Sequence, residues 1–214
     1  MLKVVLFDLD ETLYPRSSSL MTIIGKRIEY FVKGVVGGSP AVAEDLRRRW
    51  RNTYGTALRG MMEEGWPVDV EEYLKYVHDV PLDGFISPRP DVRSMLLKLP
   101  VRKAVLTNSN IEHAARVLKH INLFDCFERI IDLRTLQFRN KPDLAAYQQS
   151  LALLEVKPDE VLFVEDTAIN TRPAKALGMH TVLVDCPPSN DADYFIDNIL
   201  EVAGIVDKLI EPYK

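Results

Sequence analysis

The sequence Val4-Val5-Leu6-Phe7-Asp8-Leu9-Asp10-Glu11-Thr12 decides the fold of this chain. Its four leading apolar residues predict a strand buried on both faces, which is typical of a central strand in a parallel sheet. The strand runs directly into two aspartates at alternate positions, so the side chains of Asp8 and Asp10 point the same way. Two carboxylates at one point repel each other unless a cation or a shared proton compensates. The pattern therefore indicates either a metal site with a reactive carboxylate or an ordinary acidic turn.

Length and composition narrow the class of protein. The 214 residues suit one large domain, or a core with a modest insertion. A net charge of −4 argues against binding to a nucleic acid polymer, and we interpret the basic stretch 47–51 as the solvated face of a helix. The sequence has no apolar run of about 18 residues, so we expect no signal peptide, no contact with a membrane and a cytoplasmic protein. The two cysteines, Cys126 and Cys186, are expected to be small core residues.

Strand and helix patterns alternate over most of the chain. After the first strand we expect strands at 102–107, 129–132, 160–165 and 180–185, and helices at 111–120, 144–154 and 171–177. Strands that alternate with helices of this length predict an α/β fold with a Rossmann-like, doubly wound parallel sheet.

One long interval breaks the alternation. Between Thr12 and the second strand lie far more residues than the dozen or so that a parallel crossover needs. This interval is itself helical, with helices expected at 20–35, 41–64 and 70–77, the last beginning at a capping Asp69. We therefore expect an all-helical cap over residues 16–86, inserted into a catalytic core of residues 1–15 and 87–214.

Three further clusters of polar residues are expected at the same edge of the sheet. Thr107-Asn108 ends the second strand, Lys141-Pro142 precedes a helix, and Glu165-Asp166 ends a later strand. Each has an ordinary explanation on its own, such as a helix cap, a surface lysine or an acidic turn. Because open α/β sheets place ligands at the carboxyl ends of their strands, the ordered set indicates one shared site.

This ordered set resembles the four motifs of the haloacid dehalogenase-like hydrolase superfamily, and the resemblance covers essentially the whole chain. The helical insertion after the first motif is similar to the cap of its phosphatase and dehalogenase branch. Within that branch the chain is most similar to phosphatases of the pyrimidine 5′-nucleotidase type. The residues that carry this narrower resemblance are 10–14, 54–60 and 165–167 together with Asn170.

The resemblance implies a phosphatase that works through a covalent intermediate. Asp8 would attack the phosphorus of a small phosphomonoester, plausible candidates being pyrimidine nucleoside 5′-monophosphates, and form an aspartyl-phosphate. Asp10, held in place by Thr12, would protonate the leaving group and then activate water. Thr107, the Asn108 amide and Lys141 would stabilise the phosphoryl oxygens.

The resemblance also implies a Mg²⁺ ion as cofactor. Its ligands would be the Asp8 carboxylate, the Asp10 backbone carbonyl and Asp166. Glu165 would act from outside this ring of ligands or through a water molecule. In the cap, Tyr54 and Arg59 would contact the leaving group or a base, although packing for Tyr54 and a surface ion pair for Arg59 explain them equally well.

The sequence is also compatible with other activities. A dehalogenase would need only the nucleophile, whereas this chain also has Asp10. A phosphosugar mutase would keep the same core residues, and a non-catalytic protein that binds a phosphorylated metabolite would not need both aspartates. The four histidines show no ligand spacing and we assign them no chemistry. The sequence specifies no protein partner.

Overall fold

The computed structural model describes residues 1–210, and within that range a six-stranded sheet forms the centre of the molecule. Its strands are β1 (Val4–Phe7), β2 (Arg102–Leu106), β3 (Arg129–Ile131), β4 (Val161–Glu165), β5 (His180–Val184) and β6 (Tyr194–Ile196). All neighbouring pairs are parallel, in the order β3-β2-β1-β4-β5-β6. The prediction of a doubly wound parallel sheet is therefore confirmed.

The position of β1 explains why its carboxyl end carries a site. Phe7 is in register with Val105 of β2 on one side and with Val164 of β4 on the other. The chain visits one half of the sheet through β2 and β3 and the other half through β4 to β6, so β1 adjoins the point where the strand order reverses. Ligands bind at such points in open α/β sheets because the connecting loops diverge there.

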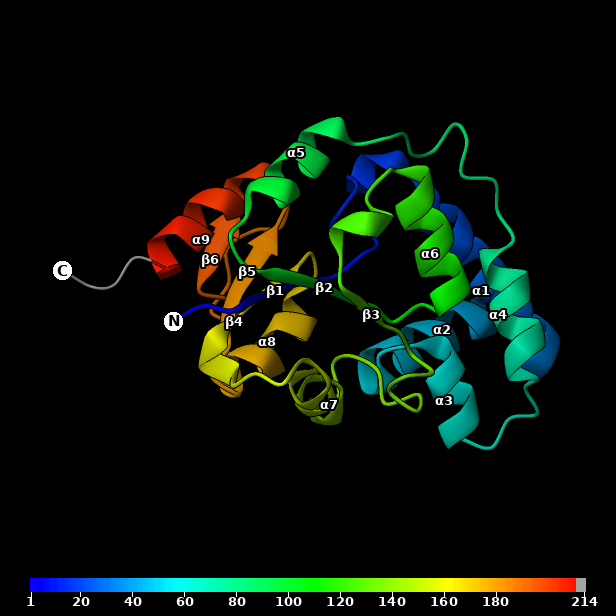
Figure 1. The fold of residues 1–214 in the computed structure, drawn as a ribbon. Coiled ribbons are helices and arrows are strands. Elements are labelled where there is room, and N and C mark those ends of the chain that lie inside the picture. The colour runs from blue at the N-terminus through cyan, green and yellow to red at the C-terminus, as the bar shows by residue number, and fades with distance from the viewer. Residues whose placement is uncertain (211–214) are drawn as a thin grey trace.

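Helices cover both faces of the sheet and form a separate group beside it. The helices are α1 (Leu20–Val36), α2 (Pro40–Tyr54), α3 (Ala57–Glu63), α4 (Val70–His78), α5 (Pro90–Lys98), α6 (Ile111–His120), α7 (Leu144–Leu154), α8 (Ala168–Ala176) and α9 (Val202–Ile210). Figure 1 shows α5, α6 and α9 on one face of the sheet, α7 and α8 on the other, and α1 to α4 grouped at one side. We refer to α1–α4 as the helical cap.

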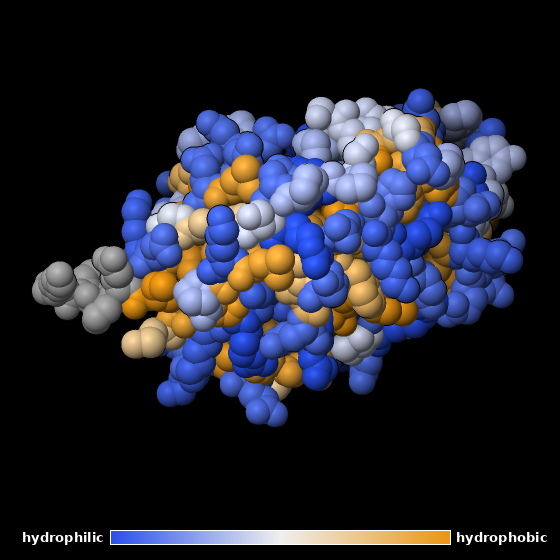
Figure 2. Space-filling model, turned by 45° about the horizontal axis from the view of Figure 1, so that its top comes forward, coloured by the Kyte–Doolittle hydropathy of each residue, from blue (hydrophilic) through white to orange (hydrophobic). Residues whose placement is uncertain are grey.

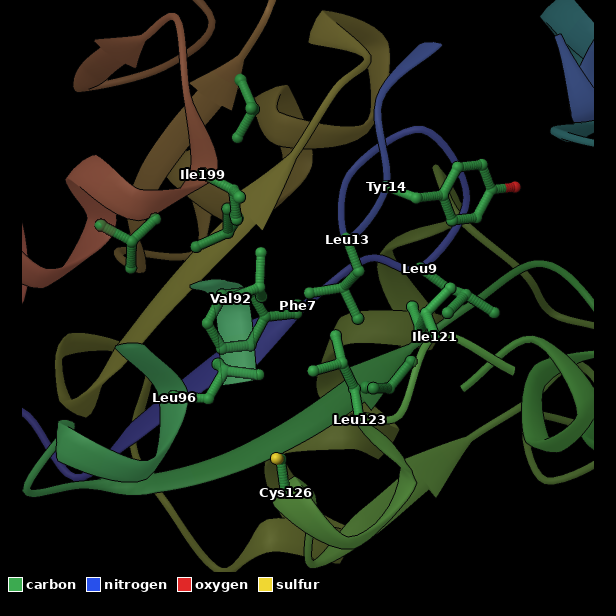
Figure 3. Close-up of a cluster of buried hydrophobic side chains, with 14 of the residues drawn as sticks. Phe7, Leu9, Leu13, Tyr14, Val92, Leu96, Ile121, Leu123, Cys126 and Ile199 are labelled. Carbon is green, nitrogen blue, oxygen red and sulfur yellow. The ribbon is translucent and has the colours of Figure 1, made fainter. Parts of the chain in front are cut away.

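Each layer has its own hydrophobic cluster. Figure 3 shows the largest one, in which Phe7 of β1 packs with Val92 and Leu96 of α5 and with Leu13 from the loop after β1. A second cluster joins the other face of the sheet to α7 and α8. Burial of this apolar surface is the main favourable contribution to folding, and here it fixes the loop that follows β1 directly over the sheet.

The cap has a third cluster, centred on the fully buried Trp50. The rings of Trp50 and Trp66 meet edge to face with centroids 6.3 Å apart. The expected capping of the last cap helix is also present, since the Asp69 side chain accepts a hydrogen bond from the Glu72 amide at 2.9 Å. An all-helical cap inserted after β1 is therefore part of the fold.

The expected single helix over residues 41–64 is wrong. The chain instead forms α2 and α3, which are separated at Gly55, whose φ is +85°. A left-handed backbone suits glycine and ends a helix, and the Thr56 hydroxyl then accepts a hydrogen bond from the Arg59 amide to start α3.

Smaller differences lie in the sheet core. Helix α8 begins at Ala168, three residues earlier than the expected start at Thr171. The sequence indicated neither α5 nor β6 nor α9. Asn110 occupies the N-cap of α6 as expected, but the carboxylate that accepts from the first helical amide belongs to Asp132, at 3.1 Å from Ile111 N.

On the face in Figure 2, hydrophilic side chains interrupt the apolar areas. Among the helices within residues 1–210, none combines the length and the apolar character that crossing a membrane requires.

Candidate active site

The carboxyl ends of β1, β2 and β4 bring the predicted residues together. The Asp8 amide continues the sheet by donating to the Val164 carbonyl at 2.8 Å, which aligns Asp8 with the end of β4. Glu165 and Asp166 follow there, and Thr107 follows β2. Asp8, Thr107, Glu165 and Asp166 are all buried, so the site lies below the surface rather than on it.

Lys141 links two of the buried carboxylates. Its Nζ lies 2.6 Å from Asp8 Oδ1 and 2.6 Å from Glu165 Oε2, and its side chain is 1% exposed. Burial disfavours the Lys141 ammonium, but Asp8 and Glu165 outweigh burial and raise its pKa. Lys141 is therefore a permanent cation at the base of the site.

Asp8 carries a perturbed carboxyl group. Burial raises its pKa from 3.8 to about 6; Lys141 opposes this rise, and the nearby carboxylates of Asp166 and Asp10 add to it. The Thr12 hydroxyl donates to Asp8 Oδ2 at 3.2 Å. Near neutral pH the Asp8 carboxylate is ionised and incompletely compensated, which suits a nucleophile.

Asp10 is held by three donors. The Tyr14 hydroxyl and His113 Nε2 lie 2.7 Å and 3.0 Å from Asp10 Oδ1, and the Ser109 hydroxyl lies 2.9 Å from Asp10 Oδ2. Burial opposes ionisation of Asp10, but His113, Tyr14 and Ser109 outweigh it and hold the pKa well below its usual range. Both oxygens are thus oriented by the protein, next to Asp8.

The donor set fits a hard divalent cation. Carboxylate oxygens of Asp8, Glu165 and Asp166 lie within 4.8 Å of one another. Lys141 pairs with Asp8 and Glu165, and Arg16, whose side chain is half exposed, reaches Asp166 Oδ2 from the rim at 2.5 Å. Carboxylate oxygens are the ligands that Mg²⁺ prefers, and a divalent charge would offset the remaining excess of negative charge. The carboxylate of Asp10, by contrast, already contacts Tyr14 and His113 through Oδ1 and accepts from Ser109 through Oδ2.

The segment of Lys141 is fixed to the cap. The Lys141 carbonyl accepts from Asn108 Nδ2 and from Asn140 Nδ2, both at 2.9 Å, and Asn140 Nδ2 also donates to the Tyr54 carbonyl at 3.1 Å. At Gly55, a Cβ atom would lie only 2.0 Å from the Lys141 carbonyl oxygen. The break between α2 and α3 therefore lies directly against the lysine of the site.

One cavity of about 630 Å³ connects the site to the cap. Asp8, Lys141 and Asp166 line the cavity from the sheet core, on the side that we call its floor, and residues of α1, α2 and α4 line it from the cap. This volume is within the range of about 300–1,000 Å³ that is typical of small-molecule sites.

A family model described as haloacid dehalogenase-like hydrolase matches residues 2–178. This chain belongs to that family. Its membership agrees with the sheet, the inserted cap and the placement of the four motifs, and it makes the protein a member of a hydrolase family.

Individual relatives carry different names. The chain is 27% identical over 199 aligned residues to Phosphate metabolism protein 8 of Saccharomyces cerevisiae. This alignment covers 85% of this chain and 61% of the yeast protein. It is 33% identical over 169 aligned residues to (S)-2-haloacid dehalogenase 1 of a Pseudomonas species. That alignment covers 67% of this chain and 72% of the dehalogenase. The crystal structure of a HAD (haloacid dehalogenase-like) phosphatase from Thermococcus onnurineus has a similar fold, with a TM-score of 0.62 and 21% sequence identity. The superposition covers 96% of this chain and 98% of the Thermococcus chain.

The geometry corrects one expected contact within the first family motif. Thr12 was expected to hold Asp10, but its hydroxyl donates to Asp8. The turn after β1 points Thr12 back toward the strand end, and Asp10 instead meets Tyr14 from the same loop. Thr107 and Asn108 line the cavity as expected, and the Thr107 oxygen accepts from the Ser109 amide at 3.0 Å.

Tyr54 and Arg59 are the two cap residues predicted to contact substrate, and neither is among the residues that line the cavity. Arg59 pairs with Asp143 at 2.8 Å and with Glu63 at 3.4 Å, and Tyr54 packs against the cap cluster. The cavity lining is formed by their neighbours Gly55, Thr56 and Leu58. The ion pair and the packing are what the alternative interpretation of these residues predicted.

The sequence assigned no role to Tyr14, Ser109 or Arg16, although each contacts an acid of the site. The same is true of His113. It is 1% exposed, contacts Asp10 through Nε2, and stacks on His78 of α4 with ring centroids 4.3 Å apart. Its Nδ1 has no hydrogen-bond partner among the described residues. The only available signal was its position on the buried face of α6, where a polar residue needs a partner.

Proposed function

We propose that this protein is a Mg²⁺-dependent phosphatase that hydrolyses a small phosphomonoester through an aspartyl-phosphate on Asp8. The observation that carries the proposal is the second carboxylate, Asp10, oriented beside Asp8 by Tyr14, Ser109 and His113. The alkoxide that leaves a phosphate ester needs a proton, whereas a leaving halide ion does not. A fixed second acid is therefore expected in a phosphatase and has no use in a dehalogenase.

The proposed reaction has two displacements. A carboxylate oxygen of Asp8 attacks phosphorus, the bond from phosphorus to the ester oxygen breaks, and Asp10 gives a proton to the leaving oxygen. Asp10 then takes a proton from water as the water attacks phosphorus, and the bond to Asp8 breaks to release phosphate. The lowered pKa of Asp10 means that it is ionised in the free enzyme, so it would take up a proton from solvent when the phosphate dianion binds beside it and would return that proton once phosphate has left.

Other residues would stabilise the charge on the phosphoryl oxygens. Lys141, Thr107 and the Asn108 amide line the floor of the cavity, where these oxygens would lie. Asp8 and Asp166 would hold Mg²⁺, with Glu165 beside them acting from outside the ring of ligands or through a water molecule, and the bound ion would supply positive charge next to the phosphoryl group. The Asp10 backbone carbonyl is the further ligand that we propose.

The test is phosphate release from a panel of esters. The panel contains uridine 5′-monophosphate, glucose 6-phosphate, phosphoglycolate and a chromogenic aryl phosphate, each with Mg²⁺ or with a chelator. Halide release from 2-chloropropionate is measured in parallel. Asp8→Asn is the variant, and Asp83→Asn, whose side chain is 98% exposed, is the matched control.

The proposal predicts Mg²⁺-dependent phosphate release that is lost in Asp8→Asn and kept in Asp83→Asn. A preference for uridine monophosphate would support the narrower nucleotidase assignment. Halide release without phosphate release would make the protein a dehalogenase. Transfer between two positions of a sugar would indicate a mutase, and thermal stabilisation by an ester that is never hydrolysed would indicate a binding protein.

A further inference from the structure

The arginines of α2 fall into two groups. Arg48 pairs with Asp45, and Arg49 pairs with Glu64 at 2.7 Å, so these two cations are matched on the outer face of the cap. Arg47 and Arg51 are four residues apart and share a helix face. Both line the cavity, and within residues 1–210 neither makes an ion pair or a side-chain hydrogen bond. The expectation of a solvated face therefore fails for the half-buried Arg47 and for the buried Trp50, whereas Arg51 lines the cavity and is also exposed.

Arg47 is the more enclosed of the pair. Its Nε atom is buried without a hydrogen-bond partner among the described residues. Its guanidinium lies beside α1, where a Cβ atom at Gly25 would be 3.6 Å from Nη1. A desolvated donor on a charged group costs free energy unless something accepts its hydrogen bond. An anionic group in the cavity would satisfy this requirement.

The carboxylates and the arginine pair of the cavity come from different parts of the chain. All of the lining carboxylates within the described range lie at or directly after the ends of strands β1 and β4, where Lys141 and Arg16 also lie close to them. The lining residues of α1 to α4 include no acid but include Arg47 and Arg51, with Asn52 beside them. A substrate whose phosphate ester lies on the floor would thus present its other end to an arginine pair.

We propose that Arg47 and Arg51 bind a second anionic group on the substrate. This inference rests on the proposed phosphatase function and names its substrate class: phosphomonoesters with a carboxylate or a second phosphate at the end remote from the scissile ester. Guanidinium groups match both anions because their N–H donors are arranged in a planar fork. A nucleoside monophosphate, which has a neutral base at that end, is then a poorer substrate.

Matched pairs of esters test this specificity. Glycerol 3-phosphate and 3-phosphoglycerate differ by one carboxylate, and glucose 6-phosphate and glucose 1,6-bisphosphate differ by one phosphate. We expect a higher kcat/KM for the acidic member of at least one pair, and the pair that responds identifies the anion. In Arg47→Gln and in Arg51→Gln, kcat/KM for that member should fall about tenfold to a hundredfold, chiefly through KM, which is the range for a lost hydrogen bond to a charged group. The neutral members should be unaffected, and Arg48→Gln on the outer face is the control.

Binding separates the failure of this inference from the failure of the proposed function. In the Asp8→Asn background, calorimetry with Mg²⁺ and 3-phosphoglycerate or the bisphosphate should show binding that Arg47→Gln weakens. If no ester is hydrolysed but this binding pattern holds, the phosphatase assignment fails and the anion site stands. If phosphate is released equally from both members of each pair, or if the acidic preference survives in both arginine variants, the inference is wrong and the phosphatase assignment stands.

Discussion

The strongest physical consequence of the site is that replacing its nucleophile should stabilise the protein. Asp8 is 6% exposed, and its pKa rises from 3.8 to about 6 because burial and neighbouring carboxylates disfavour its charge. The folded state therefore binds this proton more tightly than the unfolded state does. The contribution to stability is intact below about pH 4 and is lost as the pH rises to about 6.

The size of the effect follows from the same shift. At 1.36 kcal/mol per pKa unit, a rise from 3.8 to about 6 corresponds to about 3 kcal/mol of lost stability above pH 6. Asp8→Asn removes the charge but keeps an oxygen that can accept from Lys141 Nζ. We therefore expect this variant to be more stable than the natural protein by up to about 3 kcal/mol at neutral pH without divalent cations.

Urea unfolding with a chelator measures this difference. The gain should be present at about pH 7.5 and shrink toward about pH 4, and saturating Mg²⁺ should reduce or reverse it because the cation binds the ionised Asp8 more tightly. Asp83→Asn is the exposed control and should change stability little. An Asp8→Asn protein that is equally stable or less stable at neutral pH, in the presence of chelator, would mean that the buried Asp8 carboxylate does not destabilise the folded state.

Three further perturbations follow from individual contacts. His113→Ala removes the 3.0 Å contact to Asp10, and we expect kcat in steady-state assays to fall about tenfold to a hundredfold with little change in KM. Arg16→Gln frees Asp166 Oδ2, and calorimetry should show Mg²⁺ binding tightened by up to about fivefold, since a half-exposed ion pair contributes little. Gly55→Ala places a Cβ against the Lys141 carbonyl at a left-handed backbone position, and urea unfolding should show a loss of about 1–3 kcal/mol.

For the His113, Arg16 and Gly55 variants, a specific result would contradict the expected effect. His113→Gln keeps a polar group near Asp10 and should recover part of kcat; an equal rise in KM for both variants would indicate a general loss of structure. Unchanged or weaker Mg²⁺ binding in Arg16→Gln would mean that Arg16 does not compete for Asp166. Gly65→Ala has the same backbone strain with open space around it, so Gly55→Ala must lose more stability than this variant.

The sequence predicted the parts of the fold and site that depend on local pattern. Asp8, Thr107 and Asp166 each follow an apolar strand, and parallel strands necessarily end at one edge of a sheet. Lys141 follows no strand directly, and its place in the site came from the family resemblance. Strand β6 has three residues and pairs only along one side, which is too short for a periodic pattern to detect.

The parts that the sequence could not predict depend on contacts between distant segments. The break at Gly55 is fixed by the close approach of Lys141, and nothing in the local pattern of α2 and α3 records that neighbour. His113 is 103 residues from Asp10 and lies on an ordinary amphipathic helix. The division of the α2 arginines likewise requires knowing that one face of the helix meets a cavity and the other meets solvent.

Direct detection of the covalent intermediate tests whether Asp8 is the nucleophile. The protein is mixed with a hydrolysed ester and Mg²⁺, quenched in acid within one turnover, digested and analysed by mass spectrometry. We expect a phosphoryl group on the peptide that contains Asp8, absent from Asp8→Asn and absent when Mg²⁺ is chelated. A phosphoryl group on any other residue, or full phosphate release by Asp8→Asn, would contradict it.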